Sequence, residues 1–394
     1  MVPVHQTMNL QAWLAPVLGP AVASVLAPGL EEVARFLGTH LISGMIPAFF
    51  IAGAISVFLD KQRITRLMGP RANPFVSYPV AAFTGGILTV CSCGVIPIFA
   101  GIMNQGAGVG PAFTFLLAAP AINLIALTYT YSLIGLRFMV GRAILVAVAA
   151  MTVGFGMKLL FRDGPMSTDG PPEAVLADDD DARPVWPTIL LFGLLVLVML
   201  TGTGTFDEWF RPQGFAAHSA YLSSRDIRAL DFLLAKSLII LTEVLLIAGT
   251  LWQWFSWTEA RQWLRKSVDL FVSIFPKILL GLFLSGVLAT LIPLSDPRLM
   301  ALFDSNSPLA NFSAAFIGAL MYFGTIIGVN VVSTLMRFGM HPGPAMTLML
   351  AGPAVSLPSV LAVIPLVGRA KALAFFGLVV IVSALCGWLY GIIF

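Results

Sequence analysis

The chain has 394 residues, of which 58% are hydrophobic and 10% are charged, and its formal net charge is +3. Soluble domains carry about 25% charged residues, so this composition excludes a water-soluble globular protein. The small net charge gives no reason to expect nucleic-acid binding. At about 20 residues per span, the apolar stretches predict an all-α integral membrane protein with about nine or ten transmembrane helices.

In chain order, the sequence divides into five regions. Residues 1–37 predict an N-terminal amphipathic or short membrane segment, and 38–161 predict a first group of spans. Residues 162–185 predict an acidic flexible linker, 186–265 connecting spans with a polar loop, and 266–394 a second group of spans. The individual spans are expected at about 38–59, 76–103, 110–134, 138–161, 186–203, 230–256, 266–292, 310–337, 343–365 and 371–394.

An internal repeat links the first and second groups of spans. Residues 110–124 read GPAFTFLLAAPAINL and residues 343–357 read GPAMTLMLAGPAVSL, with nine of the fifteen positions identical. Further on, VGRA occurs at 140–143 and again at 367–370, which pairs Arg142 with Arg369. Such periodic similarity predicts two structurally related halves.

The relative orientation of the halves stays open at this level. Basic residues favour opposite loops in the two halves, which by the positive-inside rule indicates inversion. Two spans are expected between the halves, however, and an even number would leave them parallel. The sequence favours inversion weakly.

Helix-breaking residues interrupt matching spans in both halves. Pro97 and Pro120 lie inside spans of the first half, and Pro353 lies inside a span of the second. Non-helical backbone at membrane depth is tolerated only inside protein or along a wet cavity, and matched interruptions indicate a transport site. Asn123 and Ser356 each follow a proline by three residues and are candidate substrate ligands. Proline kinks relieved by packing are the alternative.

Cys91-Ser92-Cys93 is the sharpest chemical motif. In an extended stretch, positions i and i+2 face the same way, so both thiols would face one cavity and bind a soft, thiophilic species. The alternative is two small buried cysteines that only pack. The second half has no cysteine at the equivalent place, so any thiol chemistry is asymmetric.

Two charges lie near the middle of expected spans, Glu243 in 230–256 and Lys277 in 266–292. A charge at that depth costs about 2.5–3.5 kcal/mol on insertion scales and marks function or a buried partner. We expect the two to pair, or Glu243 to relay protons, as ion-coupling residues; a purely structural ion pair is the alternative. Asn330 is a candidate polar lining residue.

Three motifs carry a resemblance to a known family: TVCSCGVIPIFAGI at 89–102, LLAAPAIN at 116–123 and LAGPAVS at 350–356. With them the chain resembles the predicted permease family that includes YraQ-type proteins and the organoarsenical permease ArsP. The resemblance covers about residues 38–394, apart from the acidic linker. It implies an inner-membrane permease with a duplicated helical core and, by analogy with ArsP, efflux of trivalent organoarsenicals, whose arsenic is thiophilic. Cys91, Cys93, Pro120 and Asn123 match the family motifs.

Together these features predict a multi-pass permease of the cell inner membrane, a secondary transporter that moves a small solute through a midplane site at the broken helices. The solute is thiophilic if Cys91 and Cys93 bind it. A membrane-embedded thiol or redox enzyme using Cys91 and Cys93 is the alternative. No catalytic residue, metal cluster or cofactor is expected, and the absence of GxxxxGK[ST] excludes a self-contained ATPase. The expected partners are the substrate and the lipid bilayer, with no nucleic acid; self-association into a homo-oligomer stays open.

Overall fold

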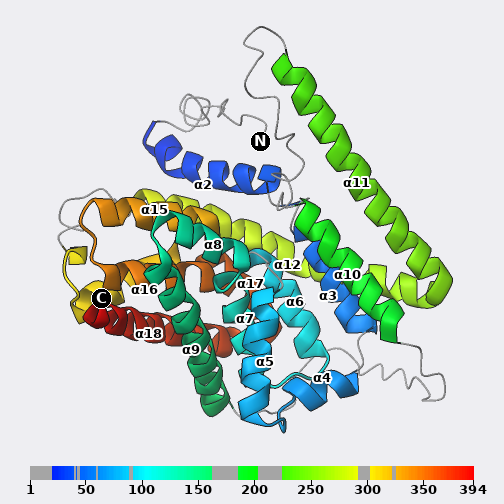
Figure 1. Ribbon diagram of the computed structural model, residues 1–394, viewed down its shortest axis with the longest axis horizontal. Coiled ribbons are helices and arrows are strands. Elements are labelled where there is room, and N and C mark those ends of the chain that lie inside the picture. Colours follow the sequence, from blue (N-terminus) through cyan, green and yellow to red (C-terminus); the bar gives the residue numbers. More distant parts are fainter. Residues whose placement is uncertain are drawn as a thin grey trace.

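The computed structural model describes residues 20–39, 41, 45–58, 61–87, 92–161, 185–202, 224–291, 302–321 and 325–394. These residues form helices and turns, and no β-strand occurs among them (Figure 1). The helices are α2 (Pro20–Thr39), α3 (Ile46–Phe58), α4 (Lys61–Met68), α5 (Pro74–Ile87), α6 (Ser92–Asn104), α7 (Val109–Ala121), α8 (Leu124–Leu133), α9 (Leu136–Leu160), α10 (Val185–Gly202), α11 (Ser224–Trp254), α12 (Trp257–Leu291), α14 (Pro308–Leu320), α15 (Thr325–Arg337), α16 (Pro342–Ala354), α17 (Leu357–Val367) and α18 (Arg369–Ile393). The prediction of an all-α membrane protein is confirmed.

Several helices are long and apolar enough to cross a bilayer. Among the described residues, four qualify singly, in α9, α11, α12 and α18, and the number rises to six if the bent pairs α7–α8 and α16–α17 each form one span. The sequence predicted nine or ten spans. The difference lies in four places where the described apolar helix has only 10–17 residues, in α3, α6, α10 and α14.

Two helices form the centre of the molecule, α7 and α16. Every residue of α7 is buried, and so is every residue of α16 from Gly343 onward. A helix that is apolar on all sides belongs inside a bundle. α7 packs against α5, α6 and α9, while α16 packs correspondingly against α14, α15 and α18 (Figure 1). The segments most alike in sequence therefore occupy equivalent central positions.

The helix bounds of α5–α9 correspond to those of α14–α18. α7 begins at residue 109 and α16 at residue 342, a shift of 233 residues, and the same shift relates α6 to α15 and α9 to α18. It also relates Gly135 to Gly368, which precede α9 and α18 with φ of 115° and 87°. Positive φ favours glycine because it has no Cβ.

This correspondence changes one expected match. With the shift of 233 residues, Arg142 of α9 is equivalent to Phe375 of α18, while Arg369 is equivalent to Leu136. The predicted pairing of Arg142 with Arg369 is therefore wrong. The two short VGRA sequences lie at different places in the helices, the first inside α9 and the second across the junction of α17 and α18. The helix bounds show which residues of the two halves are equivalent in the structure.

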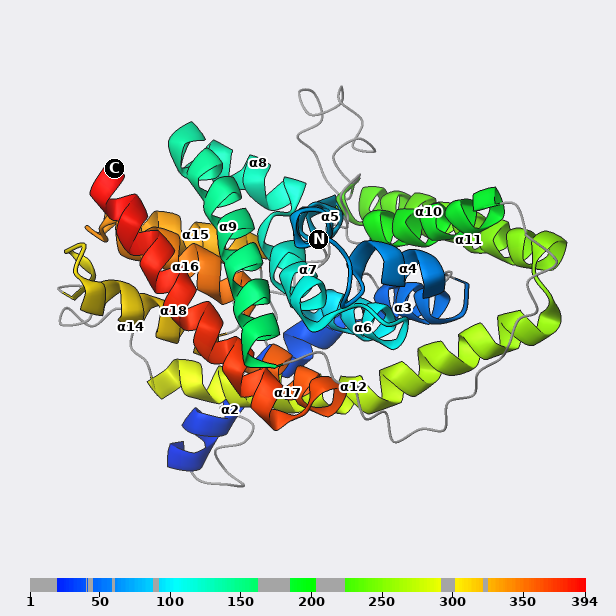
Figure 2. The same cartoon turned by 90° about the horizontal axis from the view of Figure 1, so that it is seen from below.

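The equivalent helices α9 and α18 pack against each other in opposite directions (Figure 2). Near the start of α9, the Phe138 ring lies 5.6 Å from the Tyr390 ring, near the end of α18. Near the end of α9, a Cβ on Gly156 would lie 3.2 Å from Leu378 Cδ1, in the first half of α18. These contacts require antiparallel helices. For this pair the inverted orientation holds, and the parallel alternative does not.

Helix α12 connects the two groups of helices. It packs against α2 and α3 on one side and against α17 on the other. The Trp263 indole Nε1 donates a hydrogen bond of 2.8 Å to the carbonyl oxygen of Phe50 in α3, which fixes this contact. α10 packs on both α11 and α3, at the edge of the molecule away from α18 (Figure 1).

Candidate substrate site

Each half contains a helix broken at its centre. α7 and α8 meet at a bend of 44°, and α16 and α17 meet at a bend of 45°. Pro120 and Pro353 lie buried in the last turn of the first helix of each pair. Because proline has no N–H and its ring clashes with the carbonyl four residues earlier, it removes one bond from the helical hydrogen-bond ladder just before each bend. The predicted interruptions at these two prolines thus lie at equivalent places in the core.

Asn123 and Ser356 begin the second helix of each pair. The Asn123 Oδ1 accepts a hydrogen bond of 2.7 Å from the backbone N–H of Ala126. The backbone N–H of Ser356 donates to Ser359 Oγ at 2.8 Å, as part of a capping box. Such caps satisfy amides that the helix itself leaves unpaired. The Asn123 side chain is thus a helix cap, whereas the Ser356 hydroxyl bonds the Ser359 hydroxyl at 3.3 Å. Contact of either side chain with substrate stays a prediction.

The cysteine motif stands at the start of α6. This helix begins at Ser92, so the expected extended backbone is wrong for Ser92 and Cys93. Cys91 lies outside the described residues, as do the side chains of Ser92 and Cys93. Their thiophilic role stays a prediction. Pro97 is buried within α6, one turn into the helix.

Asn330 lies on α15 at the position equivalent to Pro97. Its Oδ1 accepts a hydrogen bond of 3.0 Å from the Tyr129 hydroxyl on α8. The bond therefore joins the second arm of the broken pair in one half to a helix of the other half. The Asn330 side chain is exposed, and its role as a lining residue stays a prediction.

Glu243 and Lys277 do not form an ion pair. Glu243, on α11, is 4% exposed, and its Oε1 accepts a hydrogen bond of 2.8 Å from Thr201 Oγ1 on α10. Lys277 Nζ donates to the carbonyl oxygen of Ser273, one turn earlier in α12, at 2.6 Å. Among the described residues, no ion pair includes either side chain. The expected pairing is wrong, because the two helices carry these residues to separate places.

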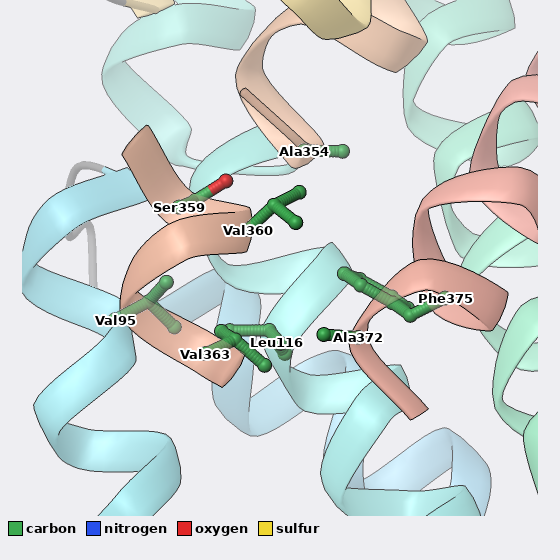
Figure 3. Close-up of a pocket in the computed structure, with 8 residues that line it drawn as sticks. All are labelled: Val95, Leu116, Ala354, Ser359, Val360, Val363, Ala372 and Phe375. Carbon is green, nitrogen blue, oxygen red and sulfur yellow. The ribbon is translucent and has the colours of Figure 1, made fainter. Parts of the chain in front are cut away.

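A small cavity lies between the two halves, beside the break in α16–α17 (Figure 3). Its volume is about 10 Å³, roughly the space that one water molecule needs. Val95 of α6 and Leu116 of α7 line it from the first half, and Val363 of α17 and Phe375 of α18 line it from the second. Ser359 adds a hydroxyl at the rim (Figure 3). The cavity is thus mainly apolar, and both halves enclose it.

Arg142 is a buried charge that sequence reasoning did not select as a site residue. It lies inside α9 with 0% exposure, and its Nη1 donates a hydrogen bond of 2.8 Å to Thr130 Oγ1. Its Nε and Nη2 have no hydrogen-bond partner in the described structure. The available signal was an arginine within the apolar span 138–161, since charges in spans are rare.

Comparison with known proteins identifies the family. Residues 32–392 match the ArsP_1 family, described as predicted permeases. The protein belongs to this permease family. The match covers the described helices from α3 to α18 except for the last residue of α18, and it confirms the resemblance found from the motifs.

Individual relatives of the permease are similar over different lengths. UPF0718 protein MJ0584 of Methanocaldococcus jannaschii is 35% identical over 373 residues, which are 94% of this chain and 97% of that protein. UPF0718 protein YcgR of Bacillus subtilis is 31% identical over 115 residues, or 29% of this chain and 38% of the relative. A putative two-component membrane permease complex subunit of Streptococcus mutans is 28% identical over 127 residues, 32% and 38% of the two chains. No solved structure matches the permease.

Family and helices together establish a multi-pass membrane permease whose substrate is a small molecule.

Proposed function

We propose that this permease is a secondary transporter that moves a small solute across the inner membrane, and that its site lies between the halves at the two helix breaks. The observation that carries the proposal is the matched pair of breaks, bent by 44° and 45°. Discontinuous helices at corresponding places of inverted repeats typically form the substrate site of secondary transporters. We also propose that the two halves are copies of one duplicated unit.

The small cavity supports the same location. It lies beside the break of α16–α17, and both halves contribute to its wall. With room for about one water molecule, it corresponds to a closed conformation of the proposed site. Movement of one half against the other would open it to either side of the membrane, as in alternating access.

For the substrate, we propose a solute with a thiophilic centre, with trivalent organoarsenicals as the first candidates for efflux. The support is the Cys91-Ser92-Cys93 motif, because Ser92 and Cys93 begin α6 and α6 provides Val95 to the cavity wall. Thiolates prefer soft metals and metalloids over hard cations. The ArsP-type members of the family supply the analogy, which by itself does not fix the substrate.

Flux measurements in proteoliposomes test both parts of this proposal. With a trivalent methylarsenical as probe, wild-type protein should catalyse flux, and the double variant Cys91→Ser/Cys93→Ser should lose it. The matched control is Cys386→Ser, which changes a buried, free cysteine on α18. Equal flux in the double variant would leave those cysteines without a substrate role.

The same measurement separates the alternative function. Absence of flux for every solute tested, together with thiol turnover that needs Cys91 and Cys93, would favour a membrane-embedded thiol or redox enzyme. A transporter requires flux that saturates with solute concentration and stops when the site is blocked.

A further inference from the structure

Arg142 is a fully buried guanidinium, and in the described structure no acidic residue lies on the helices that pack closely around it. Its exposure is 0%, and the helices that pack closely on α9 are α5, α7, α8, α16 and α18. None of these helices, nor α9 itself, contains an aspartate or a glutamate. Their titratable residues are tyrosines, Cys386 and the cations near the ends of α9 and α18. In the described part of the chain, the only ion pair is elsewhere, in α2.

An unpaired buried charge is unfavourable unless something compensates it. Burial of an ionised group without a partner costs several kcal/mol even after relaxation. Arginine near the end of a span can normally extend its long side chain to water. Arg142 lies six residues beyond Leu136, the first residue of α9, and its side chain is nevertheless enclosed completely. The shared arrangement of α9 and α18 does not by itself require a guanidinium at this position. The equivalent residue of α18 is Phe375, which is apolar.

The unsatisfied atoms of Arg142 form a usable binding edge. Its Nη1 is held by Thr130 Oγ1 at 2.8 Å, while Nε and Nη2 have no hydrogen-bond partner in the described structure. Nε–H and Nη2 lie on one edge of the planar guanidinium and point the same way. This edge is the fork that binds carboxylates and oxyanions through two parallel hydrogen bonds.

A chain of hydrogen bonds connects Nη1, on the other side of the guanidinium, to the helix break. Thr130 Oγ1 donates to the carbonyl oxygen of Ala126 at 2.6 Å. The backbone N–H of the same Ala126 donates to Asn123 Oδ1, the cap of α8, at 2.7 Å. The orientation of Arg142 is therefore set by the second arm of the broken pair. Movement at the break would move the guanidinium with it.

The repeat places Arg142 at the counterpart of the cavity. The shift of 233 residues relates Arg142 to Phe375 and Thr130 to Val363, and both Phe375 and Val363 line the cavity in the second half. The same position is thus cationic in the first half, at Arg142, and apolar in the second half, at Phe375.

We propose that the Nε–Nη2 edge of Arg142, held by Thr130 beside the break of α7–α8, binds a negatively charged carboxylate or oxyanion group of the transported solute. This inference rests on the proposed transport function, and it adds the charge class of the substrate: among thiophilic solutes it favours those that carry an anionic group over a neutral methylarsenical. The anion compensates the buried guanidinium when the site is occupied. Arg142 is then a binding residue, and Thr130 is a positioning residue that holds it.

Anion-dependent stability of the purified full-length protein in detergent tests the proposal without requiring transport. Acetate and methanesulfonate serve as probes, each titrated against chloride at equal ionic strength, and the melting temperature is recorded. For the wild type we expect a saturable rise in melting temperature with at least one probe. In Arg142→Gln the apparent affinity should fall roughly tenfold or more, because two charge-assisted hydrogen bonds are lost.

Two further variants make the measurement specific. Arg369→Gln is the matched control, since it removes an exposed arginine from the start of α18 and should leave the anion response unchanged. Thr130→Val introduces the residue found at the equivalent position 363, removes the tether of Nη1 and should weaken probe binding several-fold. This variant also provides the test if Arg142→Gln does not fold.

Absence of a saturable response in the wild type, or an equal response in Arg142→Gln, would overturn the inference. If Arg142→Gln does not fold, an unweakened response in Thr130→Val would overturn it as well. Failure of the transport proposal looks different: the anion response would depend on Arg142, yet no solute would cross a proteoliposome membrane. If the protein catalysed flux but its melting temperature responded to anions equally with and without Arg142, only the inference about Arg142 would be rejected, and the transport proposal would stand.

Discussion

At the scale of single residues, the two halves use different side chains for the same structural task. Asn123 begins α8 through its amide oxygen, whereas Ser356 begins α17 together with Ser359. Both residues stand just after a helix that ends with a buried proline. Where a helix restarts in an apolar interior, its first amides have no water to bond, so a side-chain acceptor at the restart or within the first turn is needed.

We expect Asn123→Ala to destabilise the protein by about 1 kcal/mol, because the amide of Ala126 loses its acceptor. Asn123→Ser keeps a hydroxyl oxygen at the cap, adds no charge and should lose much less. The measurement is the melting temperature of each purified variant in the same detergent. If the alanine and serine variants melted alike, the cap would have no part in holding the break.

A second prediction concerns Glu243, whose Oε1 accepts a hydrogen bond from Thr201. Its Oε2 has no partner in the described structure, so one oxygen is available for a proton. Glu243→Gln keeps an acceptor for Thr201 and cannot ionise. If Glu243 couples transport to protons, this variant should lose flux driven by a pH gradient and keep exchange of solute at equal pH. Unaltered pH-driven flux would refute the coupling role.

At the scale of helices, close packing of equivalent pairs organises the core. α9 approaches α7 where Gly154 meets Gly110, and α18 approaches α16 where Gly387 meets Gly343. A Cβ on Gly154 would lie 2.6 Å from the carbonyl oxygen of Gly110, and one on Gly387 would lie 2.8 Å from that of Gly343. Glycine is needed at these crossings because the backbones leave no room for a methyl group.

Gly387→Ala should therefore destabilise the protein by roughly 1–3 kcal/mol, the usual cost of overpacking. The new methyl group would overlap the Thr347 hydroxyl, which itself donates to Asn311 Oδ1 at 2.8 Å. Gly377→Ala on the same helix is the control, since no atom lies within 4 Å of its added Cβ. Thermal unfolding should separate the two variants, and equal melting temperatures would contradict the tight crossing.

At the scale of the whole molecule, α9 and α18 run in opposite directions, which supports an inverted arrangement of the two halves. The contacts of Phe138 with Tyr390 and of Gly156 with Leu378 fit only an antiparallel pair. Inversion lets one type of structural unit face both sides of the membrane, which suits a site that opens alternately. The buried charge of Arg142 then distinguishes the two halves chemically.

Because α9 and α18 are antiparallel, their C-terminal ends should lie on opposite sides of the membrane. Reporter tags inserted after residue 161 and after Phe394 should therefore show opposite accessibility in intact cells or sealed vesicles. A tag after Gly135, at the start of α9, should share the side of the C-terminal tag. Equal accessibility of the tags at 161 and 394 would contradict the inverted arrangement.

The sequence by itself determined the features that arise within one segment. Hydropathy predicted an all-α membrane protein, and the repeated GPA–LA–PA pattern predicted two equivalent segments, which form α7–α8 and α16–α17. Prolines act on their own helix, so the positions of the breaks at Pro120 and Pro353 were predictable as well.

Only the tertiary structure decided how distant segments meet. The structure shows that Glu243 and Lys277 have different hydrogen-bond partners. It also shows that Arg142 is the equivalent of Phe375, and that α9 and α18 are antiparallel. Charge and hydropathy along the chain indicate that a residue is buried, and they do not indicate what it faces. Partners depend on the packing of helices far apart in sequence, and therefore the isolation of the Arg142 guanidinium became visible only in the folded protein.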